Sequence, residues 1–294
     1  MRRRTRLLAL VCGGLGCIVA DAFLIEPHWI KIDRFSLGGR SSLRIVHISD
    51  IHYKGERSYL ARIVADVNRL APDVVCFTGD IVEDARYLDE AIEALGKIDA
   101  PMYGVPGNHE YWSGASFARI GDCFRGTGGE WLVDRYAVAS KGRLLIAGRS
   151  GTEIDVRRSA ADLAMPGRGM GSNPVHNSLP ASPAVRDLFG APAVEDWSTT
   201  SNAPGAKRIL LTHYPILVES IQGPPYDLIP AGHAHGGQVR LPFVGSLIVP
   251  FGVNGYQKGM YSTRAGPLHV SSGLGTFLLP VRFNCRPEIT LIEL

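Results

Sequence analysis

Cysteine is scarce in this chain, and its spacing excludes two kinds of small scaffold. The 294 residues contain five cysteines: Cys12 and Cys17 lie in an N-terminal apolar run, and Cys76, Cys123 and Cys285 stand far apart. Because there is no CxxC pair and no even set, neither a zinc knuckle nor a disulfide framework is indicated. We expect reduced thiols that are mostly buried.

The body of the protein also lacks an excess of positive charge. Lysine and arginine number 31 against 28 acidic residues, but Arg2, Arg3, Arg4 and Arg6 precede the first apolar run. Without those four, 27 basic residues face 28 acidic ones. Nucleic acid is therefore not an expected partner, because neutralising a phosphate backbone needs surplus cations. A composition of 45% apolar and 20% charged residues also excludes collagen-like, disordered and multi-span membrane chains.

Residues 1–25 have the pattern of an N-terminal anchor or signal segment. A basic start precedes an unbroken apolar run over 7–20, which as a helix is about 21 Å long, short of the ~30 Å hydrocarbon core. Continued past Asp21 to Ile25, the helix reaches about 28 Å and just spans. Three interpretations stay open: a retained anchor, which we favour; export with cleavage at Ala20-Asp21-Ala22; and a helix lying in the interface. All three interpretations bring the protein to an inner or plasma membrane, and the sequence does not decide on which face of the membrane the domain lies.

The next hundred residues alternate between buried strands and amphipathic helices. Near-continuous apolar runs predict strands over 43–49, 73–78 and 101–105, and apolar residues at helical spacing predict helices over 58–70 and 87–98. A β-α-β-α-β series favours a parallel sheet with right-handed crossovers. The fold class is therefore α/β.

The second half is richer in strands and contains one long irregular segment. Strands are expected over 131–134, 136–140 and 144–148 as one cluster, and then over 208–212, 228–231, 268–272 and 289–292. Residues 149–206 are rich in Gly, Pro, Ser and Ala, with one plausible helix near 183–189. An irregular stretch of this length is typical of a lid or a mobile insert.

Five polar clusters follow the predicted strands, where open α/β sheets place their sites. They are Asp50-Ile51-His52, Gly79-Asp80, Gly107-Asn108-His109-Glu110, His213, and Gly232-His233-Ala234-His235. Four imidazoles, two carboxylates and an amide oxygen from these clusters form a mixed N/O set without thiolate, which suits Mn²⁺, Fe or Zn²⁺. Seven such groups match two bridged ions, an arrangement that serves in-line displacement at phosphorus.

The order D-x-H, G-D, G-N-H-E, a lone His after an apolar strand, and G-H-x-H resembles the calcineurin-like metallophosphoesterase superfamily, from Arg44 to Leu294. Residues 232–242 (GHAHGGQVRLP), 272–275 (SGLG), 280–282 (PVR) and 286–289 (RPEI) resemble its membrane-associated YkuE/YaeI-like branch. The chlamydial-type UDP-2,3-diacylglucosamine pyrophosphatase of lipid A synthesis is similar to this branch. The resemblance implies a layered α/β/β/α sandwich over 43–294, preceded by the N-terminal apolar helix and interrupted by the irregular insert at 149–206.

The resemblance also implies a role for each cluster. Two divalent ions are expected, with manganese preferred and iron, zinc or magnesium as alternatives. The implied ligands are Asp50, His52 and His235 for the first ion, Asp80 as the bridge, and Asn108, His213 and His233 for the second. His109 is not a ligand: it faces the phosphate and stabilises charge or protonates the leaving oxygen.

Several other residues have plainer interpretations. His47 is expected in the core, and His28, His176 and His269 match no cluster. Glu110 either caps the following helix, which we favour, or supports the metal site. Gly236 and Gly237 permit a sharp turn or a close backbone approach. The uncharged loop 241–251 (LPFVGSLIVPF) is either core or a lipid-contacting wall, with equal weight.

Three functions remain to be separated. The leading one is a dinuclear metal-dependent phosphoric ester hydrolase at a membrane, acting on a phosphorylated and lipid-linked substrate, with the pyrophosphate bond of UDP-2,3-diacylglucosamine as the best single candidate. The alternative is an exported phosphomonoesterase or phosphodiesterase of broad specificity. A non-catalytic metal-binding scaffold is disfavoured, because none of the expected ligand positions is missing.

Overall fold

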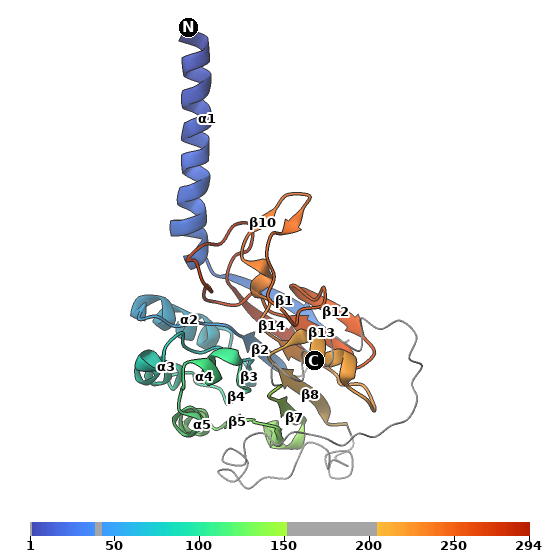
Figure 1. The fold of residues 1–294 in the computed structure, drawn as a ribbon. Helices are drawn as coiled ribbons and strands as arrows, with labels where there is room; N and C mark the ends of the chain where they lie inside the picture. Colours follow the sequence, from blue (N-terminus) through green and yellow to red (C-terminus); the bar gives the residue numbers. More distant parts are fainter. Residues whose placement is uncertain (1, 39–42, 152–204) are drawn as a thin grey trace.

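Two six-stranded sheets form the body of the protein (Figure 1). The computed structural model describes residues 2–38, 43–151 and 205–294. The strands of the first sheet lie in the order β1 (Lys31–Ser36), β14 (Glu288–Glu293), β2 (Arg44–Ile48), β3 (Val74–Phe77), β4 (Met102–Gly104) and β5 (Glu130–Trp131). Those of the second lie in the order β12 (Gly259–Thr263), β13 (Gly266–Val270), β9 (Ile229–Ala231), β8 (Lys207–Thr212), β7 (Leu144–Arg149) and β6 (Arg135–Ala139).

Helices cover the outer face of the first sheet (Figure 1). They are α2 (Arg57–Arg69), α3 (Leu88–Leu95) and α5 (Phe117–Gly126), with the short η3 (Ala85–Tyr87) and α4 (Asn108–Trp112) between them. The apolar stripe of α2 buries Leu60, Ile63 and Val67 against Val75 and Phe77 of β3. The predicted β-α-β-α-β series is confirmed, because β2, β3, β4 and β5 pair in parallel.

A second core lies between the two sheets and includes Ile45 and Val74 from the first and Ile146, Ile209 and Leu211 from the second. The outer face of the second sheet is covered, among the described residues, by η6 (Pro215–Ser220) and neighbouring loops. The structure therefore confirms the α/β class and the two-sheet sandwich; the expected outer layer on the second sheet consists, among the described residues, of the 3-10 helix η6 and loops.

Three strand predictions need correction. The first sheet is not wholly parallel, because β14 pairs antiparallel with β2. The expected cluster over 131–148 is wrong for its first strand: β5 pairs with β4 in the first sheet, while β6, β7 and the intervening η4 (Ser140–Gly142) belong to the second. Strands β1 and β12 escaped prediction because both are half-exposed edge strands without an apolar run.

The N-terminal segment stands apart from the sandwich as one long helix (Figure 1). Helix α1 (Arg2–Ala20) continues through a π turn, η1 (Asp21–Ile25), into η2 (Glu26–His28). Among the described residues, Leu10–His28 is a helix long and apolar enough to cross a membrane. A hairpin of β10 (Arg240–Leu241) and β11 (Gly245–Ser246) lies at the same end of the body. The predicted helix at 183–189, His176 and nearly all of the insert lie outside the described residues.

Candidate metal centre

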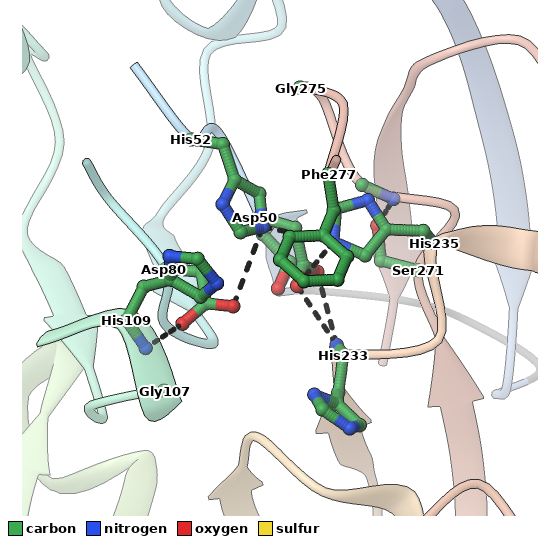
Figure 2. Close-up of polar contacts among 12 residues, drawn as sticks. Asp50, His52, Asp80, Gly107, His109, His233, His235, Ser271, Gly275 and Phe277 are labelled. Atoms are coloured by element: carbon green, nitrogen blue, oxygen red, sulfur yellow. Dashed lines mark hydrogen bonds and ion pairs between the residues drawn. The ribbon is translucent and has the colours of Figure 1, made fainter. Parts of the chain in front are cut away.

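The predicted site residues lie just after strands of both sheets, where β2, β3, β4, β8 and β9 end. A single helical turn, η7 (His235–Gly237), follows the last of them. Six of the seven expected ligands are buried, and His233 is half-buried. Strands that come from separate parts of the chain thus direct their polar ends to one place (Figure 2).

Four of these side chains form a compact group. Asp50, His52, Asp80 and His235 each offer one ligand atom within 4.8 Å of the others. The Nε2 atoms of His52 and His235 are 2.9 Å apart, and an Asp80 oxygen lies 3.4 Å from His52 Nε2. His235 Nε2 lies 3.5 Å from Asp50 Oδ1. This geometry matches what one shared cation requires.

The other three expected ligands adjoin this group through the same carboxylate. His213 Nε2 lies 3.3 Å from Asp80 Oδ2, 3.0 Å from Asn108 Oδ1 and 3.1 Å from His233 Nδ1. Asp80 Oδ2 therefore touches one histidine of each group. The structure brings all seven predicted side chains into one connected cluster with Asp80 at its centre.

Hydrogen bonds orient three of the four histidines. The distal nitrogens are Nδ1 of His52, held 2.9 Å from Glu83; Nδ1 of His213, 2.6 Å from the Thr78 carbonyl; and Nε2 of His233, 2.7 Å from the Phe251 carbonyl. Each distal N–H donates to an oxygen, so in the neutral imidazole the nitrogen that faces the cluster carries a lone pair. His235 differs, since its buried Nδ1 has no hydrogen-bond partner among the described residues.

The backbone at the cluster is held in an unfavourable conformation. Asp50, His52, Asp80, His233 and His235 all have positive φ, between 44° and 66°. Such values are uncommon for residues other than glycine and persist where the surrounding structure enforces them. Five strained residues among seven indicate that side-chain direction is fixed at the expense of local stability.

Two glycines allow the backbone to approach the carboxylates closely. A Cβ at Gly107 would overlap the Asp80 carboxylate, and one at Gly232 would lie 2.6 Å from an Asp50 oxygen. The predicted turn after His235 is also present, because Gly236 and Gly237 have φ of 60° and 78°. The glycines next to the histidines thus allow the backbone conformation and the close approach that the site requires.

Glu110 performs both of the roles between which the sequence left a choice. Its carboxylate accepts the Gly107 N–H at the start of α4, and also the N–H groups of Asp80 and Ile81, at 2.7 to 2.9 Å. Asp80 Oδ1 in turn accepts the His109 N–H at 2.8 Å. The buried Glu110 therefore caps α4 and fixes the loop that carries the central aspartate.

Comparison with known proteins identifies the family to which the chain belongs. The sequence profile of the calcineurin-like phosphoesterases matches residues 43–237, which is more than half of the chain. The chain belongs to the calcineurin-like phosphoesterase family. It is therefore a metallophosphoesterase, a hydrolase.

Three curated relatives align along most of their length with this metallophosphoesterase. The uncharacterized metallophosphoesterase YkuE of Bacillus subtilis is 28% identical, with 97% of this chain and 93% of YkuE covered. The phosphodiesterase YaeI of Escherichia coli is 25% identical, with 92% and 90% covered. The UDP-2,3-diacylglucosamine pyrophosphatase LpxG of Chlamydia trachomatis is also 25% identical, with 92% and 90% covered.

The donor set of the metallophosphoesterase fits the divalent cations that its family implies. When both rings are neutral, His213 Nε2 and His233 Nδ1 each present a lone pair to the other, and His213 Nε2 also faces an Asp80 oxygen. These atoms are all hydrogen-bond acceptors, and no hydrogen lies between them. Burial alone would lower the pKa of His213, but Asp80 and Asp50 raise it to about 9. The site attracts positive charge, and a cation that binds there displaces the proton.

Three neighbouring groups, Asp80, His233 and His235, have the protonation states that metal ligands need. Burial alone would raise the pKa of Asp80, but the nearby histidines, chiefly His213, hold it well below its usual range. Burial lowers the pKa of His233 to about 3, and it lowers that of His235 strongly. Ionised carboxylate and neutral imidazoles are thus favoured together.

His109 lies beside the cluster rather than in it. Its ring packs edge-on against His52, with centroids 4.4 Å apart, and its Nδ1 is 3.5 Å from Glu83. Glu83 contacts both histidines and was missed by the sequence analysis, because it belongs to no motif and follows Asp80 by three residues. Those nearby contacts single Glu83 out as a further residue of the site.

A pocket of about 360 Å³ opens from the metal centre of this metallophosphoesterase. One wall carries His52, Asp80, Asn108 and the histidine pair His233 and His235, with His109 beside them. The remaining wall is mostly apolar and includes Trp112, Leu247, Ile248, Phe251, Phe277 and Leu279. Figure 2 places the Phe277 ring next to His235. The pocket joins a polar reaction site to an apolar surface.

Of the histidines outside the clusters, His47 lies in the core as predicted. His47 is buried in the core, with Nε2 2.8 Å from Thr78 Oγ1 and Nδ1 2.8 Å from His269 Nδ1. His28 is exposed at the base of the N-terminal helix. The five cysteines are all free thiols, but the expectation that most are buried is wrong: Cys76 and Cys285 are buried, Cys123 is half-buried, and Cys12 and Cys17 are exposed.

Proposed function

We propose that this metallophosphoesterase hydrolyses a phosphodiester or pyrophosphate bond with two divalent cations, held by the seven clustered side chains. Asp50, His52 and His235 would hold one ion, Asn108, His213 and His233 the other, and Asp80 would bridge them. The observation that supports this best is the position of Asp80 Oδ2, 3.4 Å from His52 and 3.3 Å from His213. Manganese is the preferred ion, with iron, zinc or magnesium as alternatives.

The protein's own residues have three tasks in this proposal. When bound, the cations supply a nucleophile from water at neutral pH and neutralise charge on the phosphate. His109, at the pocket wall, donates a proton to the leaving oxygen or stabilises its charge. Glu83 orients His52 and His109, and Glu110 keeps Asp80 in place.

A lipid-linked substrate suits the pocket and the N-terminal helix. The wall facing the metal centre is mostly apolar, and Leu10–His28 is long and apolar enough to span a bilayer. Retention of that helix as an inner or plasma membrane anchor is the favoured arrangement. LpxG, named as a UDP-2,3-diacylglucosamine pyrophosphatase, is a relative over 92% of this chain. The pyrophosphate bond of UDP-2,3-diacylglucosamine is therefore the first substrate to test.

Turnover by the purified full-length protein tests the reaction class. We expect Mn²⁺-dependent hydrolysis of bis-p-nitrophenyl phosphate that falls by at least about 100-fold in Asp80→Asn, because the central anion is lost. Asp122→Asn, on the exposed face of α5, is the matched control and should retain full activity. Unchanged hydrolysis in Asp80→Asn would reject the two-metal assignment.

The substrate is tested separately from the reaction class. We expect the gene to complement a strain that lacks its own UDP-2,3-diacylglucosamine pyrophosphatase, and Asp80→Asn not to do so. Failure to complement by folded, membrane-bound and Mn²⁺-active protein would remove this substrate. YaeI is named as a phosphodiesterase, so an equal preference for nucleotides, simple diesters and phospholipid head groups would favour the broad-specificity alternative.

A further inference from the structure

Two loops at the mouth of the pocket expose large apolar side chains and carry no charge. The segments 241–251 (LPFVGSLIVPF) and 276–281 (TFLLPV) are together called the apolar rim. Phe243 is fully exposed, and Ile248 and Leu278 are each 79% exposed. The rim also includes the exposed side chains of Val244, Leu247, Phe251 and Leu279. A contiguous exposed apolar surface of this kind marks an interaction site.

The two loops of the rim are connected to each other. The Gln238 side-chain amide donates to the carbonyls of Phe277 and Val281 at 3.2 and 3.4 Å, and its oxygen accepts the Phe277 N–H. The Arg240 N–H donates to the Phe283 carbonyl, and the Phe283 N–H donates to the Gln238 carbonyl, each at 2.8 Å. The rim is therefore one surface with a defined shape.

The rim is also fixed to the base of the N-terminal helix. The Arg282 N–H donates to the Ala22 carbonyl at 2.9 Å, and the buried Glu26 carboxylate accepts the N–H groups of Asn284 and Cys285. The Arg282 guanidinium is fully buried and donates to backbone carbonyls, among them that of Ser272 at 2.9 Å. The helix and the rim thus keep a fixed relative position.

The apolar rim lies on the side of the molecule from which the N-terminal helix projects. The β10–β11 hairpin, whose turn carries Phe243, lies at the end of the body from which α1 projects (Figure 1). Next to the helix base, Arg286 stacks over the exposed Trp29 ring at 4.0 Å. Tryptophan and arginine beside the end of an apolar helix are typical of the membrane–water interface.

We propose that the apolar rim docks into the interfacial layer of the lipid bilayer that receives α1. The inference rests on the proposed membrane role of α1, but not on the identity of the substrate. Lipid is favoured as the occupant over a protein because the rim has no charged residue and continues from a helix whose side chains, from Leu10 to Val19, are exposed and apolar. In the docked position the mouth of the pocket, which is lined by Leu247 and Leu279, lies directly at the bilayer surface. A phosphate group attached to a lipid then reaches the candidate metal centre while the lipid chains stay in the membrane.

Depth-dependent fluorescence quenching tests the docking without any substrate. Full-length Phe243→Trp and Leu278→Trp are reconstituted into phosphatidylcholine vesicles with brominated acyl chains, and the parent protein provides the background of native tryptophans. We expect the added fluorescence to be quenched at least about twofold in both variants. Val138→Trp is the control, because Val138 is 63% exposed on β6, the edge strand of the second sheet beyond β7. Quenching at 243 and 278 no greater than at 138 would overturn the proposal.

A kinetic test separates docking from the reaction itself. Phe243 does not line the pocket, so Phe243→Glu should keep its rate on soluble bis-p-nitrophenyl phosphate and lose at least about tenfold on a phosphodiester lipid held in vesicles. Val138→Glu should keep both rates. Absence of turnover in the parent protein would reject the proposed function and leave the quenching result to decide on docking. A parent dimer in detergent that Phe243→Glu dissociates would assign the rim to a second copy and overturn the membrane proposal.

Discussion

At the scale of single residues, the site depends on two carboxylates that are not among the expected metal ligands. Glu110 accepts three backbone N–H groups around Asp80, and Glu83 accepts from His52 at 2.9 Å. Neither residue would itself be a ligand in the proposed arrangement. Both determine where the ligands point, and the position of an imidazole nitrogen decides whether it reaches a cation.

Glu83→Gln is expected to lower turnover by about 10- to 100-fold without unfolding the protein. The amide still accepts a hydrogen bond from His52, but its neutral oxygen no longer strengthens that imidazole as a ligand or holds His109 by charge. Activity on a soluble diester, measured across Mn²⁺ concentrations, checks this prediction. Glu93→Gln, exposed on α3, is the control. Equal activity in the two variants would contradict a positioning role for Glu83.

The clustering of the eight predicted site residues could be anticipated from the sequence because short motifs place them relative to strand ends. Asp50 and His52 follow β2 directly, so the end of an apolar run locates them. Glu83 could not be found in this way. It lies in a loop between β3 and η3, and only the folded backbone brings it to His52 and His109.

At the scale of elements, prediction succeeded where burial imposes a period. Helix α2 and strand β3 were predicted because each buries a face or a whole run in the core. Strand β1 has alternating half-exposed and exposed residues and depends on parallel pairing with β14, which follows it by about 250 residues. The sheet to which β5 belongs is likewise decided by a partner distant in sequence, so the local pattern grouped it with β6.

Strands β2 and β13 provide an element-scale prediction for pH. Their histidines His47 and His269 are fully buried and face one another between the sheets, with Glu288, itself paired with Lys31, beside His269. Burial lowers the pKa of both imidazoles below 6.5. Below pH 6.5 the unfolded chain therefore binds protons that the folded chain excludes. Stability is complete above that pH and falls as the pH drops.

The expected loss is up to about 1.4 kcal/mol per pH unit for each histidine. Urea unfolding of the chelator-treated protein between pH 5 and 7.5 measures it. His47→Gln should reduce the slope of the unfolding free energy against pH in this range, whatever its effect on stability at pH 7.5. His28→Gln, at an exposed site, should leave the slope unchanged. A slope in His47→Gln equal to that of the parent protein would contradict the prediction.

At the scale of the whole molecule, the candidate metal centre lies where the two sheets meet. Asp50, Asp80 and Asn108 come from the first sheet, and His213 and His233 from the second, so cations bound between them would cross-link the sandwich at one edge. The five positive φ angles at the site work in the opposite direction, since strained backbone weakens the apo fold. Metal binding should therefore be visible in global stability as well as in activity.

Removal of metal by a chelator should lower the melting temperature by several degrees and abolish turnover, and added Mn²⁺ should restore both. A ligand at 100 times its dissociation constant stabilises a fold by about 2.7 kcal/mol. In Asp80→Asn the Mn²⁺-dependent rise should be largely lost, because both ions lose the shared carboxylate, while Asp122→Asn should behave as the parent. Differential scanning fluorimetry with and without Mn²⁺ measures the shift. The parent protein could instead keep the same melting temperature with and without Mn²⁺ while its activity still depends on Mn²⁺. That result would mean that the ions do not bridge the two sheets.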